Sequence, residues 1–291
     1  MICALPGNAE FAARLRAELD QPALGLEYRR FPDGESYLRL TDDVKERDVV
    51  LVCTLNDPDS KTLALLFAAR TAKDLGARSV GLVAPYLGYM RQDRRFKPGE
   101  AITSAHFAGL ISEAFDWLVT VDPHLHRRTS LAEIYSIPSR AVLAAPALAE
   151  WISHNVERPL VVGPDSESEQ WAADVARGCG APYAVMQKTR LGDRDVRIEV
   201  PPLGHWKDRA PVLIDDIVSS ARTMALAAAK IREAGLRVPV CVGVHAVFAP
   251  GALEALREAG VARIATTDTI AHETNAIDVT SLVAAAIKGL G

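Results

Sequence analysis

Residues 211–224 read PVLIDDIVSSARTM, and this stretch predicts a strand that passes through a short polar turn into a helix. The apolar residues 212–214 are typical of a buried strand. Two carboxylates and a hydroxyl-rich turn follow, and an Ala-rich helix is expected over residues 221–234, with Gly235 as its stop signal. A buried strand joined in this way to a helix indicates a parallel sheet that is covered by helices.

The same alternation continues in both directions from this stretch. The expected strands cover residues 49–53, 79–84, 117–121, 160–162, 183–186, 212–214, 238–244 and 262–266. The expected helices cover residues 60–75, 101–114, 141–155, 169–177, 221–234, 252–259 and 280–288. Two series of strands meet near the helix at 141–155, so we expect two α/β domains, residues 1–145 and residues 146–291. The sequence leaves open whether the closing helix packs back on the first domain.

Composition excludes several classes of protein. The 291 residues are 49% hydrophobic and 24% charged, with a formal net charge of −4, so no basic field favours nucleic acid. The N-terminus lacks a basic start and a long apolar run, and no stretch predicts a membrane span. None of the four cysteines forms a C-x-x-C pair, which indicates reduced thiols. We therefore expect a soluble cytoplasmic protein.

The residues after the 212–214 strand have the chemistry of a phosphate and sugar site. Free N–H groups at a helix N-terminus suit a phosphate, and the hydroxyls of Ser219, Ser220 and Thr223 are further donors. The carboxylates of Asp215 and Asp216 suit ribose hydroxyls or a hydrated Mg²⁺. A purely structural alternative is that Asp216 and Ser219 cap the helix. From these residues alone, the two interpretations weigh equally.

Ligands of parallel sheets bind at the carboxyl ends of strands, and polar residues follow four further expected strands; a fifth polar segment, at 30–35, follows no expected strand. These segments are RFPDGE at 30–35, PYLGYMRQDR at 85–94, VTVDPH at 119–124, VVGPDSES at 161–168 and KTR at 188–190. Taken one by one, a turn, an exposed charged loop or a structural histidine explains each of them as well.

Together, however, the segments resemble one family. Residues 215–223 resemble the D-D-x-x-D-T-x-G-T loop of type I phosphoribosyltransferases and ribose-phosphate pyrophosphokinases, with departures at Ser219, Ser220 and Arg222. Residues 30–35 resemble the R-F-x-D-G-E signature of the pyrophosphokinases, and residues 85–94 their P-Y-x-x-Y-x-R-Q-D-R motif. Ordinary phosphoribosyltransferases do not carry the R-F-x-D-G-E signature. The resemblance extends over nearly the whole chain.

This resemblance implies two phosphoribosyltransferase-like domains, each a mainly parallel sheet flanked by helices. It also implies pyrophosphoryl transfer from ATP to ribose 5-phosphate, with Mg²⁺ as the cofactor and a homodimer or larger homo-oligomer. By the same resemblance the site residues are as follows. Those for ATP are Phe31, Asp33, Glu35, Arg91, Gln92, Asp93 and His124. Those for ribose 5-phosphate are Asp215, Asp216, Ser219, Ser220, Ala221, Arg222 and Thr223. His124 and Asp165 are implied as metal ligands, and Lys188 and Arg190 as the catalytic cations of a mobile segment.

Two departures from the family pattern keep alternatives open. Arg222 stands where glycine is usual, and backbone that wraps a phosphate often needs the freedom of glycine. Residues 166–168, Ser-Glu-Ser, replace glycines and add negative charge. One alternative is a catalytically weak regulatory paralogue, which the intact Lys188 and Arg190 oppose. Another is a phosphoribosyltransferase that acts on a base, which the motifs of the first half oppose. A third is a pyrophosphokinase for a different phosphorylated sugar, which Arg222 favours.

Overall fold

The computed structural model describes residues 1–125, 127–190, 196–199, 201 and 204–290. The chain divides into two compact units. The first comprises residues 1–142 with 280–291, and the second comprises residues 143–279. The expectation that residues 1–145 and 146–291 are separate folding domains stays a prediction. Each unit is described by itself below.

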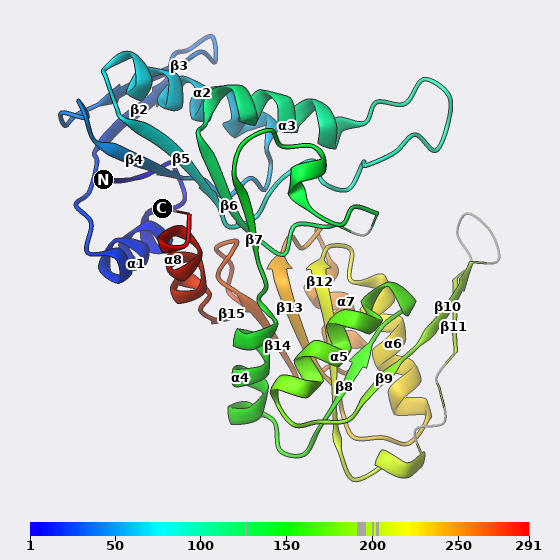
Figure 1. The fold of residues 1–291 in the computed structure, drawn as a ribbon. Coiled ribbons are helices and arrows are strands. Elements are labelled where there is room, and N and C mark those ends of the chain that lie inside the picture. Colours follow the sequence, from blue (N-terminus) through cyan, green and yellow to red (C-terminus); the bar gives the residue numbers. More distant parts are fainter. Residues whose placement is uncertain (126, 191–195, 200, 202–203, 291) are drawn as a thin grey trace. The chain divides into compact units, whose positions relative to one another are not determined.

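The first unit is built on a five-stranded parallel sheet with the strand order β1-β4-β5-β6-β7 (Figure 1). These strands are β1 (Ile2–Ala4), β4 (Asp48–Val52), β5 (Ser79–Ala84), β6 (Trp117–Val121) and β7 (Ser139–Val142). The helices that accompany them are α1 (Ala9–Leu19), α2 (Asp59–Asp74) and α3 (Thr103–Ala114). The central strands β4, β5 and β6 are buried almost throughout, which explains their continuous apolar sequences.

A two-stranded antiparallel hairpin in the first unit was not anticipated from the sequence. It consists of β2 (Leu26–Arg30) and β3 (Ser36–Leu40), and β3 packs on α2. Its residues are mostly exposed or half-buried, and three arginines interrupt the apolar pattern. The pattern of a buried strand is therefore missing, although the backbone pairing is regular.

The closing helix α8 (Thr280–Lys288) belongs to the first unit, a point that the sequence left open. It lies beside α1 and also contacts β6 and β7 (Figure 1). Val283 and Ala284 are buried in this contact. Lys288 Nζ donates to the carbonyl of Glu18 at 3.2 Å, and Arg140 Nη2 donates to the carbonyl of Gly289 at 2.9 Å.

The second unit is built on a six-stranded parallel sheet with the order β15-β14-β13-β12-β8-β9. These strands are β8 (Pro159–Gly163), β9 (Tyr183–Val185), β12 (Ala210–Val218), β13 (Val240–Ala246), β14 (Arg263–Thr267) and β15 (Asn275–Ile277). The helices of this unit are α4 (Ala145–Asn155), α5 (Glu169–Gly178), α6 (Arg222–Glu233) and α7 (Ala252–Glu258). The expected fold class, α/β with parallel sheets flanked by helices, is confirmed.

Three expectations about element boundaries are wrong. The strand expected at 212–214 continues through the paired carboxylates to Val218, because β13 runs alongside and supplies hydrogen-bond partners as far as Ala246. The helix expected over 141–155 begins only at Ala145, because residues 139–142 pair with β6 as an edge strand. The segment at 188–190, expected as a loop, lies in β10 (Gln187–Arg190), which pairs antiparallel with β11 (Val196–Glu199), while its expected mobility stays a prediction. The other expected bounds agree with the structure to within two residues.

In the part of the chain that the structure describes, every helix is too short or too polar to cross a bilayer.

Candidate functional site

Three carboxylates gather at the carboxyl edge of the second sheet. β8 and β12 are parallel neighbours, so Asp165 after β8 comes close to Asp215 and Asp216 in β12. Burial, then the negative charge of Asp216 and a hydrogen bond with it, raise the pKa of Asp215 well above its ordinary value, and Asp165 adds to this effect. The backbone N–H of Asp216 donates to Asp215 Oδ1 at 3.0 Å. Accumulated negative charge of this kind favours a ligand that brings positive charge or hydrogen-bond donors.

The carboxylate cluster fits a divalent cation, but it does not enclose one. Among the described residues, no three His, Cys, Asp or Glu side chains converge closely enough to hold a metal ion. Oxygen ligands suit Mg²⁺, which usually keeps several waters and takes other ligands from substrate phosphates. Asp165 is therefore suited to contribute one ligand of a cation whose coordination is completed by substrate and water. His124, the other expected ligand, follows β6 in the first unit.

The loop of residues 219–221 connects β12 to α6, whose first residues are Arg222 and Thr223, and this loop is held by the segment after β13. The N–H of Phe248 donates to the carbonyl of Val218 at 2.9 Å, and the N–H of Ala249 donates to the carbonyl of Ser219 at 3.1 Å. The loop therefore enters α6 at a defined angle. The first N–H groups of an α-helix have no partner within the helix, so this terminus can receive a phosphate.

Arg222 does not occupy the position in this loop that needs a glycine. The residue with left-handed backbone is Ala221, with φ 56° and ψ 4°, and Arg222 is the first residue of α6. Arginine at 222 therefore meets no backbone conflict, because residue 222 is helical, and its effect on phosphate binding stays a prediction. The exposed Arg222 side chain stands at the helix N-terminus instead.

The Ser-Glu-Ser stretch at 166–168 forms a short 3₁₀ helix that closes on Asp165. Ser168 Oγ donates to the carbonyl of Asp165 at 2.6 Å and lies 3.4 Å from its N–H. Gly163, the last residue of β8, permits this arrangement, because a Cβ there would collide with Ser168 Oγ. The departure from the glycines of the family pattern thus produces a compact turn behind Asp165.

In the first unit, Phe31, Asp33 and Glu35 lie in the exposed turn of the β2–β3 hairpin. The N–H of Gly34, at φ 93°, donates to the carbonyl of Phe31 at 2.9 Å, and the N–H of Glu35 donates to Asp33 Oδ1 at 3.1 Å. The guanidinium of Arg29 lies 4.5 Å from the centre of the Phe31 ring. These contacts hold an aromatic ring and two carboxylates at the tip of the hairpin, 38% of the Phe31 surface being exposed.

The second predicted group, Arg91, Gln92 and Asp93, follows β5 and is anchored by two arginines that sequence reasoning missed. Arg127 Nη1 donates to both oxygens of Asp93, at 3.1 and 3.2 Å. Arg128 Nη2 donates to the Asp93 carbonyl at 3.2 Å. The sequence did offer a signal for this contact, namely the two adjacent arginines that follow β6. Because its carboxylate is paired and only 5% exposed, Asp93 is better suited to position the segment than to bind ATP directly.

Within the described part of the unit, the two predicted ATP groups are not linked to each other by polar interactions. No hydrogen bond or ion pair there links residues 31–35 to residues 91–93. His124, half-buried, follows β6. Lys188 and Arg190 have backbone in β10, but their side chains lie outside the described residues.

Comparison with known proteins finds relatives along the full chain. The chain is 34% identical to a ribose-phosphate pyrophosphokinase of Methanothermobacter thermautotrophicus over 290 residues, which cover 99% of this chain and 100% of the relative. It is 35% identical to a ribose-phosphate pyrophosphokinase of Saccharolobus solfataricus, with 87% of each chain covered. The fold matches that of phosphoribosylpyrophosphate synthetase from Mycobacterium smegmatis with a TM-score of 0.88, at 24% identity, over 100% of this chain and 98% of that one.

Two family models divide the chain between them. Residues 130–282 match the phosphoribosyl transferase domain, which assigns the carboxylates and loop after β12 to an enzyme of the phosphoribosyltransferase type. Residues 1–114 match the N-terminal domain of ribose phosphate pyrophosphokinase. The chain belongs to the ribose-phosphate pyrophosphokinase family.

Proposed function

We propose that this enzyme transfers the pyrophosphoryl group of ATP to the anomeric hydroxyl of ribose 5-phosphate, with AMP and 5-phosphoribosyl 1-pyrophosphate as products. Membership of the pyrophosphokinase family supports this reaction. The structural observation that carries it is the pair Asp215–Asp216 followed by the loop into α6, which unites acceptors for a sugar with donors for a phosphate. The match of residues 1–114 favours a pyrophosphokinase over a transferase that acts on a base.

Ribose 5-phosphate is placed by the second unit. Asp215 and Asp216 accept hydrogen bonds from ribose hydroxyls, which offsets the repulsion between the clustered carboxylates. The hydroxyls and N–H groups of residues 219–223 and the N-terminus of α6 hold the 5-phosphate. This arrangement leaves the anomeric hydroxyl free to attack the β-phosphorus of ATP.

ATP is placed by the hairpin tip and the segment after β5. Phe31 offers a ring on which adenine stacks, and the carboxylates of Asp33 and Glu35 accept from its exocyclic amine. Arg91 and Gln92 bind the nucleotide, while Asp93 holds their backbone in place through Arg127.

The chemistry of the transfer is mainly positioning and charge stabilisation. Lys188 and Arg190 neutralise negative charge that builds up on the transferred group. His124 and Asp165 are the residues that the family resemblance assigns to Mg²⁺, and the bound ion would supply positive charge against the polyphosphate. A dedicated base on the chain is not required, because a largely dissociative transfer needs little proton abstraction.

Product analysis with and without sugar tests this proposal. We expect AMP to form from ATP and Mg²⁺ only when ribose 5-phosphate is present, together with an equal amount of phosphoribosyl pyrophosphate. AMP formed without the sugar would contradict it, and bound ATP without turnover would contradict it and favour the regulatory paralogue.

A second candidate is a pyrophosphokinase for another phosphorylated sugar, which the exposed Arg222 at the α6 N-terminus favours. Arg222→Gly separates the two. If Arg222 pairs with the 5-phosphate, Arg222→Gly should raise the KM for ribose 5-phosphate about tenfold or more. Arg222→Lys, which keeps a positive charge, should have a KM closer to that of the parent enzyme. If Arg222 obstructs ribose 5-phosphate, the glycine variant should bind that sugar more tightly than the parent enzyme.

The proposal also covers the oligomeric state of the enzyme and its location in the cell. We infer a homodimer or a larger homo-oligomer from the family resemblance, and light scattering of the purified chain tests it. A cytoplasmic location agrees with four cysteines that form no disulfide.

A further inference from the structure

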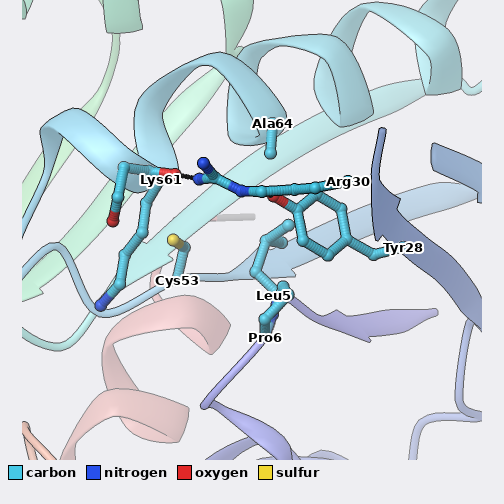
Figure 2. A pocket seen from close by; sticks show the side chains of 8 residues that line it. Leu5, Pro6, Tyr28, Arg30, Cys53, Lys61 and Ala64 are labelled. Carbon is cyan, nitrogen blue, oxygen red and sulfur yellow. Dashed lines mark hydrogen bonds between the residues drawn. The ribbon is translucent and has the colours of Figure 1, made fainter. Parts of the chain in front are cut away.

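The first unit contains a cavity of about 200 Å³ that the proposed reaction does not use. It lies at the carboxyl ends of β1 and β4, where Leu5 and Pro6 follow β1 and Cys53 follows β4 (Figure 2). Ala64 of α2 adds to this apolar lining. None of the described residues that line the cavity is among those assigned above to ATP or ribose 5-phosphate.

One cation of the cavity comes from the hairpin. Arg30 is the last residue of β2, and it lines one side of the cavity together with Tyr28, as Figure 2 shows. Its Nε lies 3.2 Å from Tyr28 Oη, and its Nη2 donates to the carbonyl of Ser60 at 2.8 Å. A guanidinium has five N–H donors, so these two bonds fix its plane and leave other donors available.

A second cation comes from α2. Lys61 Nζ donates to the Thr54 carbonyl at 2.8 Å and to Asn56 Oδ1 at 2.6 Å, which leaves one of its three donors. Burial lowers the pKa of Lys61, and the nearby Cys53 and Asp57 offset this only in part. Among the described residues, no carboxylate lies within ion-pair distance of Lys61 or Arg30.

Lys61 is a half-buried cation without a carboxylate partner, which is unfavourable unless a ligand supplies negative charge, and the exposed Arg30 lines the same cavity and adds a second positive charge. A phosphomonoester carries between one and two negative charges near neutral pH, which matches two cations. Cavities for drug-sized ligands measure roughly 300–1,000 Å³, so this one suits a molecule smaller than a nucleotide. We propose that the cavity binds a small organic phosphate, whose phosphate pairs with Arg30 and Lys61 while a short apolar body contacts Leu5, Pro6 and Ala64.

Cys53 provides a local reporter of occupancy, because it lines the cavity and its thiol is free. Methyl methanethiosulfonate is added with increasing phenyl phosphate, and modification of each cysteine is followed by peptide mass spectrometry. Modification of Cys53 is slow, because burial raises its pKa to about 12.

We expect phenyl phosphate to slow the modification of Cys53 further, with an effect that saturates as its concentration rises. Modification of Cys179, which lies outside the cavity, should stay unchanged. Protection by benzyl alcohol equal to that by phenyl phosphate would overturn the proposal, and so would protection by neither. Equal protection by benzoate would replace phosphate by carboxylate as the ligand chemistry and overturn it too.

Variants test which side chains bind the probe. Lys61→Met and Arg30→Met should each raise the half-protecting concentration about tenfold or more, because each removes a charge-assisted hydrogen bond. Lys61→Arg should retain protection. Arg70→Met is the matched control, since Arg70 lies on the same helix but pairs with Glu113 at 3.9 Å outside the cavity. An equal effect of Arg70→Met, or none of Lys61→Met, would overturn the proposal.

Calorimetry gives a second measure that does not depend on thiol reactivity. Phenyl phosphate is titrated into the parent enzyme and into Lys61→Met, with neither ribose 5-phosphate nor ATP present, so that no other phosphate competes for the cavity. The proposal is supported if the variant loses one binding site or binds more weakly than the parent, and it is refuted if the two bind equally or if neither binds. Formation of AMP is not measured in either experiment, so a negative result here leaves the proposed reaction intact.

Discussion

Replacing Arg127 with methionine should impair the use of ATP without removing any group that touches the substrates. Arg127 holds both oxygens of Asp93 at 3.1 and 3.2 Å and thereby anchors the segment that carries Arg91 and Gln92. Methionine keeps much of the length of the side chain but leaves the Asp93 carboxylate, which is only 5% exposed, without its cation. Part of the free energy of ATP binding then goes into ordering the segment, so ATP binds more weakly.

The size of the effect follows from the burial of this pair. Removing one partner of a fully buried pair costs about 3–5 kcal/mol, whereas an exposed pair contributes about 0.2–1 kcal/mol. Asp93 is buried but the Arg127 side chain is 39% exposed, so we expect about 1–2 kcal/mol. At about 1.4 kcal/mol per factor of ten, the KM for ATP should rise roughly 5- to 30-fold. The kcat should change little, since Arg127 acts through Asp93.

Steady-state formation of AMP, with ATP varied at saturating ribose 5-phosphate, measures this effect. The double variant Asp93→Asn with Arg127→Met should show a coupling of about 1 kcal/mol, because each single change already breaks the pair. Lys97→Met is a matched control, an exposed cation of the same loop for which no ion pair is seen in the described chain. A KM for ATP within about twofold of the parent value, or a loss confined to kcat, would refute the reasoning.

Three further outcomes are expected. Ala221→Gly should raise the free energy of unfolding in urea by about 0.5–1 kcal/mol, because φ at Ala221 is 56°, whereas Ala229→Gly inside α6 should lower it by about 1 kcal/mol. Gly163→Ala should destabilise the protein by about 1–3 kcal/mol and reduce kcat, because its Cβ collides with Ser168 behind Asp165; Gly109→Ala in α3, with open space around it, should stabilise. Chelation of divalent ions should abolish AMP formation and added Mg²⁺ should restore it; activity that survives chelation would exclude the metal-dependent mechanism.

The parallel sheets were predictable because the information is local. The stretches at 49–53, 79–84 and 117–121 are almost continuously apolar, and each proved to be a buried strand. The β2–β3 hairpin escaped prediction because its residues are largely exposed and charged, so hydrophobic pattern carried little information. The same holds for β10, whose charged sequence resembles a loop but pairs with β11.

The sequence predicted the residues of the candidate site better than it predicted the contacts that position them. The strand–carboxylate–loop–helix unit around Asp215 is contiguous, so sequence could identify it as a phosphate and sugar site. The contacts that position it are not contiguous. The carbonyl of Ser219 is held by Ala249, and Asp165 is turned by Ser168 through space that Gly163 leaves open.

The sequence by itself determined the α/β class, the places where strands end in ligand-binding residues, and the family to which these motifs point. Each is encoded in neighbouring residues, through hydrophobic period and motif spacing. Only the tertiary structure decided that α8 joins the first unit, that Asp93 pairs with Arg127, and that Arg30 and Lys61 face one cavity. These depend on contacts between residues far apart along the chain, and no local pattern specifies which partner a buried charge or an apolar helix face will find.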